Sequence, residues 1–309
     1  MDIDLVYLWV NGNDPKWIEK RNRSIGKTSS AQENCEGRYV DNDELKYSLR
    51  SVEMYAPWIR KIFIVTDNQV PAWLDTTNPK IQIVDHTEII PREYLPCFNS
   101  AVIEHHLHRI EGLAEHFLYA NDDMYINKPV SPADFFGKDG LPIMRMNLRI
   151  LRKIYFYYRT KVQGKDLQNY RLTIHNSARL VEQKYGKYYC SKTHHNIDAY
   201  CKSDYRHTRE LFDAEISATC SNQVRSANDI QRNIYSYVPL VEKRAHKRYV
   251  TQRTSFRFHI DNRKLYRKFE RYNPTFFCMN DSQYANDDDR LCAKEFISRH
   301  FPLKSQFEK

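Results

Sequence analysis

Short apolar segments alternate with segments of helical periodicity along the first 120 residues, and this alternation restricts the fold more than any other feature of the sequence. The strand-like segments are residues 2–10, 62–66, 81–84 and 117–120. Residues 43–55 and 100–113 carry apolar side chains at helical spacing. Helices that alternate with buried strands predict an α/β fold with parallel strand pairs.

The pattern changes after residue 140. Residues 141–309 are mostly helical in periodicity and rich in Lys and Arg, with one late strand predicted at 275–281. We therefore expect a sheet-forming half, residues 1–140, and a basic half, residues 141–309, that completes the same domain.

Glycine and cysteine exclude several kinds of site. The chain has 8 Gly, and none of them forms GxGxxG or GxxxxGK[ST], which excludes a glycine-cradled phosphate site. The 7 Cys are an odd number without a CxxC pair, so we expect reduced, mostly buried thiols. Apolar runs fall far short of the roughly 20 residues of a membrane helix. No secretory signal precedes the first strand, so we expect a cytoplasmic protein.

Positive charge is concentrated in two segments. The chain has 48 Lys and Arg, 39 Asp and Glu, and a net charge of +9. Residues 145–171 have a net charge of +7 and residues 243–272 of +9, so the remainder is net −7. Cations interleaved with aromatic residues suit a polyanion, an anionic membrane surface or a phosphate-rich substrate, and two solvated helical faces are the simpler alternative. The acidic remainder and the lack of a nucleic-acid-binding motif argue against nucleic acid.

Polar side chains follow the ends of several predicted strands, where ligands bind in open α/β sheets. These residues are Asn11, Asp67, Asp85, Asp122 with Asp123, and Asn280 with Asp281. Paired carboxylates suit Mg²⁺ or Mn²⁺, which bridges protein oxygens to the phosphates of a nucleotide. An Asx turn that caps a helix is the alternative for the acidic pair.

Histidine and arginine supply further candidates. His105 and His108 share a helical face, but no HExxH motif or well-spaced cysteines accompany them, which argues against zinc. Arg225 precedes a predicted helix with Ser226 as its N-cap. It is either an exposed charge or a fork for phosphate oxygens.

Four blocks of the sequence form a recognisable pattern. They are IDLVYLWVNGNDPKW (3–17), the region 38–130 that ends in FLYANDDMYINKPV, the region 184–231 with KYGKYYCSKTHHNIDAY and VRSANDIQ, and FFCMNDSQ (276–283) followed by FPLKSQFE (301–308). The blocks resemble the Stealth family of sugar-1-phosphate transferases, which includes bacterial capsular polysaccharide phosphotransferases and the catalytic core of the animal GlcNAc-1-phosphotransferase. The third block has His195-Asn196-Ile197 where the family usually has His-x-Pro. This leaves His194 and His195 as alternatives, and the spacing to Arg225 favours His195.

The resemblance implies a GT-A-like nucleotide-sugar fold with helices on both faces of the sheet and a largely helical, basic C-terminal part. Residues 1–140 would bind the donor, and residues 141–309 would form the acceptor side. The implied reaction transfers a hexose-1-phosphate, such as N-acetylhexosamine-1-phosphate, from a UDP-sugar to a hydroxyl of a glycan or phosphoglycan acceptor, with release of UMP. The alternative on the same fold is glycosyl transfer with release of UDP.

The resemblance also implies roles for individual residues. Asp123 and Asp281, or its neighbour Asn280, would hold Mg²⁺ or Mn²⁺. Arg225 would clamp the phosphoryl oxygens, and His195 would take the acceptor proton or stabilise the leaving phosphate. The remaining candidates are the acids Asp4 and Glu104 and the donor-pocket residues Asn11, Gly12 and Asn42 through Arg50. The basic segments would hold a phosphoglycan, and peripheral association with the inner membrane is the competing use of their charge.

Overall fold

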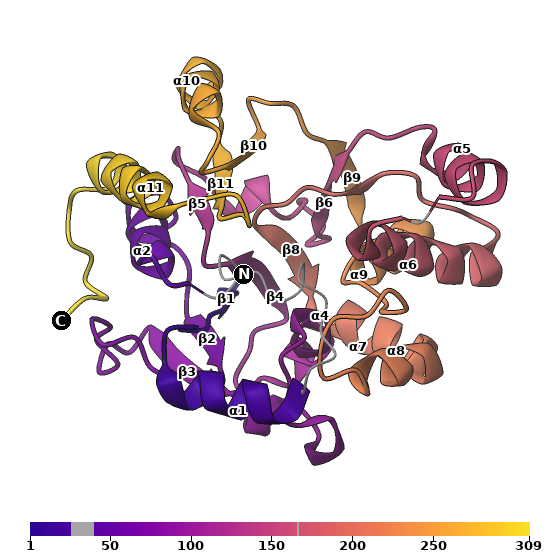
Figure 1. Cartoon of the computed structure of the whole chain (residues 1–309), viewed down its shortest axis with the longest axis horizontal. Helices are drawn as coiled ribbons and strands as arrows, with labels where there is room; N and C mark the ends of the chain where they lie inside the picture. Colours follow the sequence, from indigo (N-terminus) through magenta and orange to yellow (C-terminus); the bar gives the residue numbers. More distant parts are fainter. Residues whose placement is uncertain (26–39, 166) are drawn as a thin grey trace.

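The core of the protein is a five-stranded sheet of order β3-β2-β1-β4-β8 (Figure 1). It is seen in a computed structural model that describes residues 1–25, 40–165 and 167–309. The strands are β1 (Ile3–Leu8), β2 (Ile62–Thr66), β3 (Ile81–Asp85), β4 (His116–Asn121) and β8 (Asp198–Cys201). β1 to β4 pair in parallel, and β8 runs antiparallel to β4. The predicted parallel α/β sheet is confirmed.

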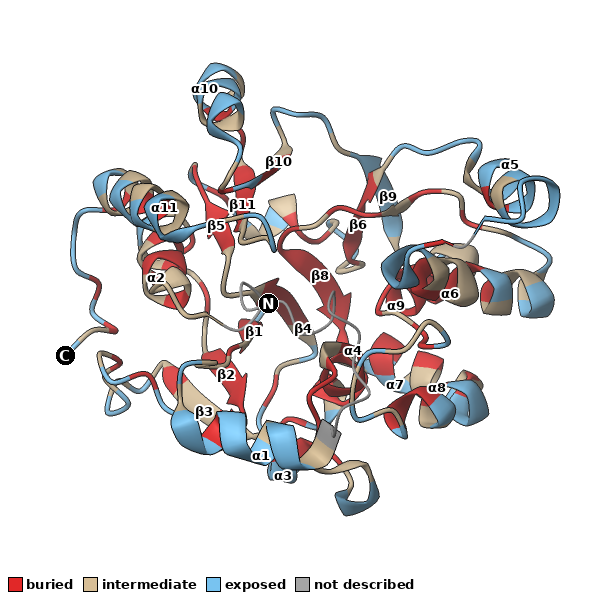
Figure 2. Ribbon diagram, in the orientation of Figure 1, coloured by how far each residue is buried: buried red, intermediate tan, exposed pale blue. Residues whose placement is uncertain are grey.

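Helices cover both faces of this sheet, as predicted, and leave its strands buried (Figure 2). On one face Leu5 and Tyr7 of β1 pack with Leu45 and Leu49 of α2 (Glu44–Tyr55). On the other face Val6 packs in a cluster to which several helices contribute. They include α4 (Ser100–Glu104), α7 (Lys202–Leu211), α8 (Asp213–Cys220) and α9 (Ile234–Val241). The alternation of side chains along a strand explains this division.

A second sheet, β10-β11-β5, stands beside the first. β5 (Met124–Ile126) follows β4 after the turn at Asp122 and Asp123, and it pairs antiparallel with β11 (Phe276–Asn280). β10 (Ser255–His259) pairs in parallel with β11. An aromatic cluster that includes Phe269 and Phe277 packs this sheet against α10 (Arg263–Tyr272) and α11 (Asp287–His300).

A third sheet, β7-β6-β9, lies in the basic half. Its strands are β6 (Ile143–Asn147), β7 (Lys192–Thr193) and β9 (His246–Tyr249). The remaining helices are α1 (Pro15–Ile25), α3 (His86–Ile89), α5 (Arg152–Tyr157), which continues as the π-helical segment η5 (Tyr158–Val162), and α6 (Asn169–Tyr185). The basic half thus contains short strands that the sequence pattern did not indicate beside the predicted strand at 275–281.

The helix predicted at 100–113 is shorter in the structure. α4 ends at Glu104, and a single 3₁₀ turn, η3 (Leu107–Arg109), follows. The imidazole Nδ1 of His106 donates to the Val102 carbonyl at 2.8 Å, which the backbone N–H of His106 would bind in a continuing α-helix. The side chain therefore replaces the helical hydrogen bond at this point.

None of the helices in the described ranges combines the length and the apolar character needed to cross a bilayer.

Candidate functional site

The turn between β4 and β5 places two acids side by side at the carboxyl edge of the central sheet. Asp122 and Asp123 occupy this turn, and the backbone N–H of Asp123 donates to Asp122 Oδ1 at 3.1 Å. Asp122 lines a pocket that also contains Arg225, and Asp123 faces β11. The turn therefore joins two clusters of polar side chains.

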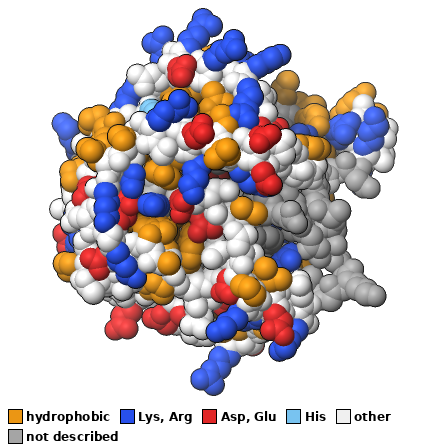
Figure 3. All heavy atoms as spheres, turned by 60° about the vertical axis from the view of Figure 1, so that its left-hand side comes forward, with side chains coloured by type: hydrophobic (Ala, Val, Ile, Leu, Met, Phe, Trp, Pro, Cys, Tyr) orange, Lys and Arg blue, Asp and Glu red, His pale blue; other side chains and the backbone are white. Residues whose placement is uncertain are grey.

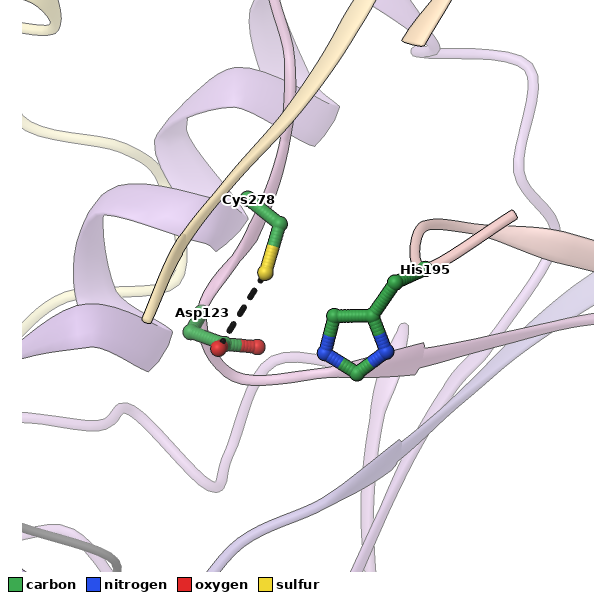
Figure 4. A group of neighbouring side chains, drawn as sticks. All are labelled: Asp123, His195 and Cys278. Carbon is green, nitrogen blue, oxygen red and sulfur yellow. Dashed lines mark hydrogen bonds between the residues drawn. The ribbon is translucent and has the colours of Figure 1, made fainter. Parts of the chain in front are cut away.

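The first of these, which we call the Asp123 cluster, consists of Asp123, His195 and Cys278, drawn in Figure 4, together with Asn280. The Cys278 thiol donates to Asp123 Oδ2 at 3.2 Å, and Asn280 Nδ2 donates to the same oxygen at 2.6 Å. His195 Nε2 lies 3.4 Å from Asn280 Nδ2. Cys278 and Asn280 reach the cluster together because side chains two residues apart in a strand point to the same side.

Two oxygen atoms of the Asp123 cluster lack partners. Asp123 Oδ1 and Asn280 Oδ1 are buried and accept no hydrogen bond from the residues that the structure describes. Buried polar atoms are almost always satisfied, so these two oxygens are available to accept another group. One ligand atom each from Asp123, His195 and Cys278 lie within 4.8 Å of one another. The residues present therefore fit a divalent cation with mixed oxygen, nitrogen and sulfur ligands.

The acids around the turn repel one another. Burial raises the pKa of Asp123 to about 6, against the hydrogen bonds from Cys278 and Asn280. Burial, and then the neighbouring charges of Asp123 and Glu44, raise the pKa of Asp122 well above its usual value. The pKa of Glu44 is raised to about 7, again mainly by burial. A bound cation would relieve this unfavourable concentration of negative charge.

His195 is held neutral. Burial lowers its pKa well below the usual value, and the nearby cations Arg257 and Lys192 lower it further. Arg257 pairs in register with Cys278, so both side chains lie on the same face of the second sheet. A neutral imidazole can accept a proton or bind a cation.

His194 points elsewhere. Its Nδ1 lies 2.9 Å from Ser255 Oγ, and its Nε2 lies 3.2 Å from the Ile197 carbonyl and 3.3 Å from Asp198 Oδ1. Both nitrogens of this buried ring have partners within the fold. Of the two alternatives, the structure brings His195 to the Asp123 cluster.

Asp281 also turns away from the Asp123 cluster. Its Oδ2 accepts from Arg290 Nε at 2.8 Å, and its Oδ1 accepts from the backbone N–H of Ser282 at 2.6 Å. Of the two residues considered as a second metal ligand, Asn280 lies in the cluster and Asp281 is bound to α11.

The second cluster is a pocket at the ends of β1, β2 and β4, which we call the Arg225 pocket. Arg225 is exposed at its rim, and its Nη2 donates to Ser100 Oγ at 2.7 Å. The lining includes three aromatic rings and two polar side chains of β4 and its turn: Trp9, Trp17, Phe98, Asn121 and Asp122. An arginine, an acid and flat apolar walls in one pocket suit a ligand that combines a ring with phosphates.

Glu104 lies beneath this pocket in a buried network. The Tyr119 hydroxyl lies 2.8 Å from Glu104 Oε1 and 2.7 Å from Asn121 Oδ1. The Arg232 guanidinium lies over the Tyr119 ring at 4.1 Å and donates to Asp198 Oδ2 at 2.9 Å. Burial raises the pKa of Glu104, and Arg232 opposes this shift. Glu104 thus supports Asn121, which lines the pocket.

The donor-pocket candidates occupy different places. Asn11 and Gly12 form the turn after β1, where the backbone of Asn11 exchanges two hydrogen bonds of 3.0 Å with the Gln69 amide. Asn42 donates to Glu44, one of the acids near Asp122. Arg50 makes a two-point ion pair with Glu308 and so fixes the C-terminal segment to α2.

Asp4 lies at the opposite edge of the sheet, at the amino end of β1. Its buried carboxylate accepts from Arg60 Nε and Nη2 at 2.9 and 2.6 Å and from the backbone N–H groups of Lys61 and Ala114. These bonds join β1 to the two loops that precede β2 and β4. The structure therefore does not bring Asp4 to either cluster.

Sequence reasoning missed Cys278 and Arg257. Both belong to the second sheet, and only the pairing of β10 with β11 and of β11 with β5 brings them to Asp123. The available signal was the spacing of Cys278 and Asn280, which places both residues on one side of the late strand.

Comparison with known proteins gives consistent matches. Models of Stealth conserved regions 1 and 2 match residues 1–29 and 38–144. The capsular polysaccharide phosphotransferase fcs1 of Haemophilus influenzae is 36% identical over 92% of this chain and 79% of that protein. LcbA of Aeromonas hydrophila, also a capsular polysaccharide phosphotransferase, is 34% identical over 97% of this chain and 84% of that protein.

Two further matches are a longer relative and a solved structure. The exopolysaccharide phosphotransferase SCO6023 of Streptomyces coelicolor is 34% identical over 99% of this chain, which spans 52% of that protein. A crystal structure of the galactosyltransferase LgtC with donor and acceptor sugar analogues has a TM-score of 0.45 and 12% identity, over 97% of this chain and 95% of that one.

Proposed function

Because the chain belongs to the Stealth family, we propose that it transfers a hexose-1-phosphate from a UDP-sugar to a hydroxyl of a glycan or phosphoglycan acceptor. N-acetylhexosamine-1-phosphate is the proposed group, and UMP is the proposed leaving product. The enzyme is a phosphotransferase, as its named relatives are. The first half, residues 1–140, would hold the donor, and residues 141–309 would form the acceptor side.

The observation that supports this proposal best is the shared turn at Asp122 and Asp123. It places the Arg225 pocket and the Asp123 cluster next to each other, because one acid lines the pocket and the other faces His195. A nucleotide in the pocket would direct its pyrophosphate toward the cluster. Attack at phosphorus requires that the pyrophosphate charge is neutralised and that the two reacting oxygens are held in line. Arg225 lies on one side of the turn, and Arg257 and the base His195 lie on the other, so positive charge and a base are both available.

We assign the chain's own groups as follows. Arg225 binds the phosphoryl oxygens from the pocket side, and Arg257 supplies positive charge from the side of the second sheet. His195 Nε2 takes the proton of the attacking acceptor hydroxyl, because its ring is neutral before the acceptor binds. The bond formed joins the acceptor oxygen to the β-phosphorus, and the bond broken joins that phosphorus to the bridging oxygen that leaves with UMP.

Mg²⁺ or Mn²⁺ is the proposed cofactor. Asp123 Oδ1 and Asn280 Oδ1 are the free oxygens that would hold it, with His195 and Cys278 close by. When bound, the cation neutralises charge on the pyrophosphate. Mn²⁺ suits the nitrogen and sulfur atoms of this cluster better than Mg²⁺ does.

The acceptor is proposed to approach over the basic half. Lys192 and Arg257 lie close enough to His195 to lower its pKa, so an anionic phosphoglycan would meet positive charge beside the base. We further propose that the enzyme works at the cytoplasmic face of the inner membrane, with which it associates peripherally.

Identification of the released nucleotide tests the reaction. The protein is incubated with an acceptor glycan and a panel of UDP-sugars, and the nucleotides are separated by ion-exchange chromatography. Release of UMP is expected, together with a phosphodiester signal in the phosphorus NMR spectrum of the product. Release of UDP with a phosphorus-free product would establish the glycosyl-transfer alternative instead.

A further inference from the structure

The segment after β6 exposes an unusual number of apolar side chains. Of the 17 large hydrophobic residues that are exposed in the described ranges, nine lie between residues 148 and 170. We call the part from 148 to 165 the α5 surface. Its exposed apolar members are Leu148, Ile150, Leu151, Ile154, Tyr155, Tyr157, Tyr158 and Val162. Exposed apolar patches of this kind mark surfaces that bind a partner.

Among the described residues, the α5 surface is attached to the rest of the molecule chiefly through α6. Phe156 is its buried residue, and its ring lies 4.7 Å from that of His175 on α6. Lys153 forms an ion pair with Glu182 of the same helix. The other sides face outward at the periphery of the fold, where α5 is coloured almost entirely as exposed in Figure 2.

The charge of the α5 surface is positive throughout. Residues 148–165 contain six Lys and Arg and no acid. Arg149, Lys161 and Lys165 are exposed among the apolar side chains. A segment that combines exposed aliphatic residues, tyrosines and cations has the composition of helices that lie in the headgroup region of an anionic bilayer.

The helix α10 is basic like the α5 surface but differs from it in the exposure of apolar side chains. α10 carries five exposed cations, and Lys and Arg gather over it at the top of the face shown in Figure 3. It exposes no large apolar residue, because Phe269 is buried in the aromatic cluster. α10 is therefore an ordinary solvated basic face, whereas the α5 surface is not.

The aliphatic residues also distinguish between anionic partners. A hydrated phosphoglycan offers charge and sugar rings, which cations and tyrosines can bind. It offers nothing to Ile150, Leu151, Ile154 and Val162, which are 61% to 73% exposed. Acyl chains below a layer of anionic headgroups satisfy both kinds of side chain.

We propose that the α5 surface docks the protein on an anionic lipid bilayer, with its aliphatic side chains inserted at headgroup level. This inference deepens the peripheral association proposed above and names the surface responsible. The surface begins directly after β6, which pairs with β7. The Ser191 hydroxyl accepts from the Arg149 backbone N–H at 3.2 Å. Because His195 follows β7 by two residues, docking would place the acceptor side of the active site next to the membrane.

The test is sedimentation with vesicles of phosphatidylcholine, with and without phosphatidylglycerol. The wild-type protein should bind only the anionic vesicles, and less at high salt. The variant I150S/L151S/I154S should lose about tenfold or more of this affinity. K161Q/K165Q should also bind more weakly. Two controls should bind as the wild type: K264Q/R267Q/K268Q on α10, and L291S/L303S, which removes exposed apolar residues elsewhere.

Three results would overturn the proposal. The first is equal binding by I150S/L151S/I154S and the wild type. The second is wild-type binding to a phosphoglycan but not to anionic vesicles. The third is a wild-type dimer that this variant converts to a monomer. Circular dichroism checks that the variants fold. Transfer to a short soluble acceptor should be unchanged in all of these variants. A variant that loses vesicle binding and keeps full turnover would therefore support the docking role of the α5 surface. If the wild-type protein itself shows no turnover, the proposed reaction is wrong, and the docking proposal is unaffected.

Discussion

The amide of Asn280 holds one oxygen of Asp123, at 2.6 Å from Nδ2 to Oδ2, and the other oxygen of the same carboxylate is buried with no partner among the described residues. The carboxylate is therefore fixed in orientation while Oδ1 stays free to bind. Carboxylates that bind metal ions are commonly held by a hydrogen bond from a neighbouring group in this way.

Replacement of Asp123 should remove activity and cation binding together. Asp123→Ala should lower turnover at least about 10²-fold, because a cation at the pyrophosphate supplies several kcal/mol of charge stabilisation. Asp123→Asn should be nearly as damaging, since an amide is a weaker ligand for a hard cation. Turnover with and without EDTA, and Mn²⁺ binding followed by electron paramagnetic resonance, measure the effect. Asp288→Asn, an exposed acid on α11, is the control. Full wild-type activity in EDTA would contradict the assignment.

Asn280 and Asp281 should differ. Asn280→Ala should weaken Mn²⁺ binding by about tenfold or more, because the site loses the Asn280 oxygen and the carboxylate of Asp123 loses its fixed orientation. Asp281→Asn should keep the Mn²⁺ affinity and lower the thermal midpoint, since it weakens the pairing with Arg290. Isothermal titration with Mn²⁺ and thermal unfolding separate the two effects. The reverse pattern would make Asp281 the ligand.

The two adjacent histidines offer a matched pair. His195→Ala should lower kcat by about 10²–10⁴-fold, the usual contribution of a general base, with an unchanged thermal midpoint. His194→Ala should lower the thermal midpoint, because Ser255 Oγ and Asp198 Oδ1 lose their contacts with the buried imidazole. Steady-state kinetics and thermal unfolding of both variants measure this. If the His195 variant is unstable and the His194 variant is stable but inactive, then His194 is the base and His195 has the structural role.

The sequence predicts those parts of the fold and of the site that depend on residues close together in the chain, and it does not predict those that depend on distant residues. The helix α2 and the ends of β1, β2 and β4 follow from local periodicity, and Asp123 follows from the rule that ligands bind beyond strand ends. Cys278 and Arg257 could not be found in this way, because antiparallel pairing of β11 with β5 brings together residues about 150 positions apart. β8 has only four residues, too few for a periodic signal. The location of Asp4 could have been predicted, because a residue at the start of a parallel strand lies at the amino edge of the sheet, away from the edge where ligands bind.

Cation binding should depend on pH. The pKa of Asp123 is raised to about 6 and that of Glu44 to about 7, so both acids take up protons as the pH falls through this range. Mn²⁺ affinity should therefore decrease by about tenfold for each pH unit below 6, because a protonated carboxyl does not bind the cation. Titrations at pH 5, 6 and 7.5 measure this, and an affinity that does not change with pH would contradict it.

Without metal, the raised pKa of Asp123 should make the free energy of unfolding decrease as the pH rises, whereas Mn²⁺ affinity increases with pH. Between about pH 4 and pH 6 the folded protein binds more protons at Asp123 than the unfolded chain does, so this group's contribution to stability falls as the pH rises through that window. Asp123→Asn should remove this part of the slope in thermal unfolding with EDTA present, and excess Mn²⁺ should reverse it in the wild type.

The fate of the β-phosphorus tests the proposed reaction most directly. The active UDP-sugar is labelled with ³²P at this atom and incubated with the protein, a divalent cation and the acceptor. Attack at phosphorus predicts that the label moves into the glycan product and that the released nucleotide, UMP, carries none. A label that stays with the nucleotide as UDP, beside an unlabelled glycan product, would show attack at the sugar carbon and contradict the account.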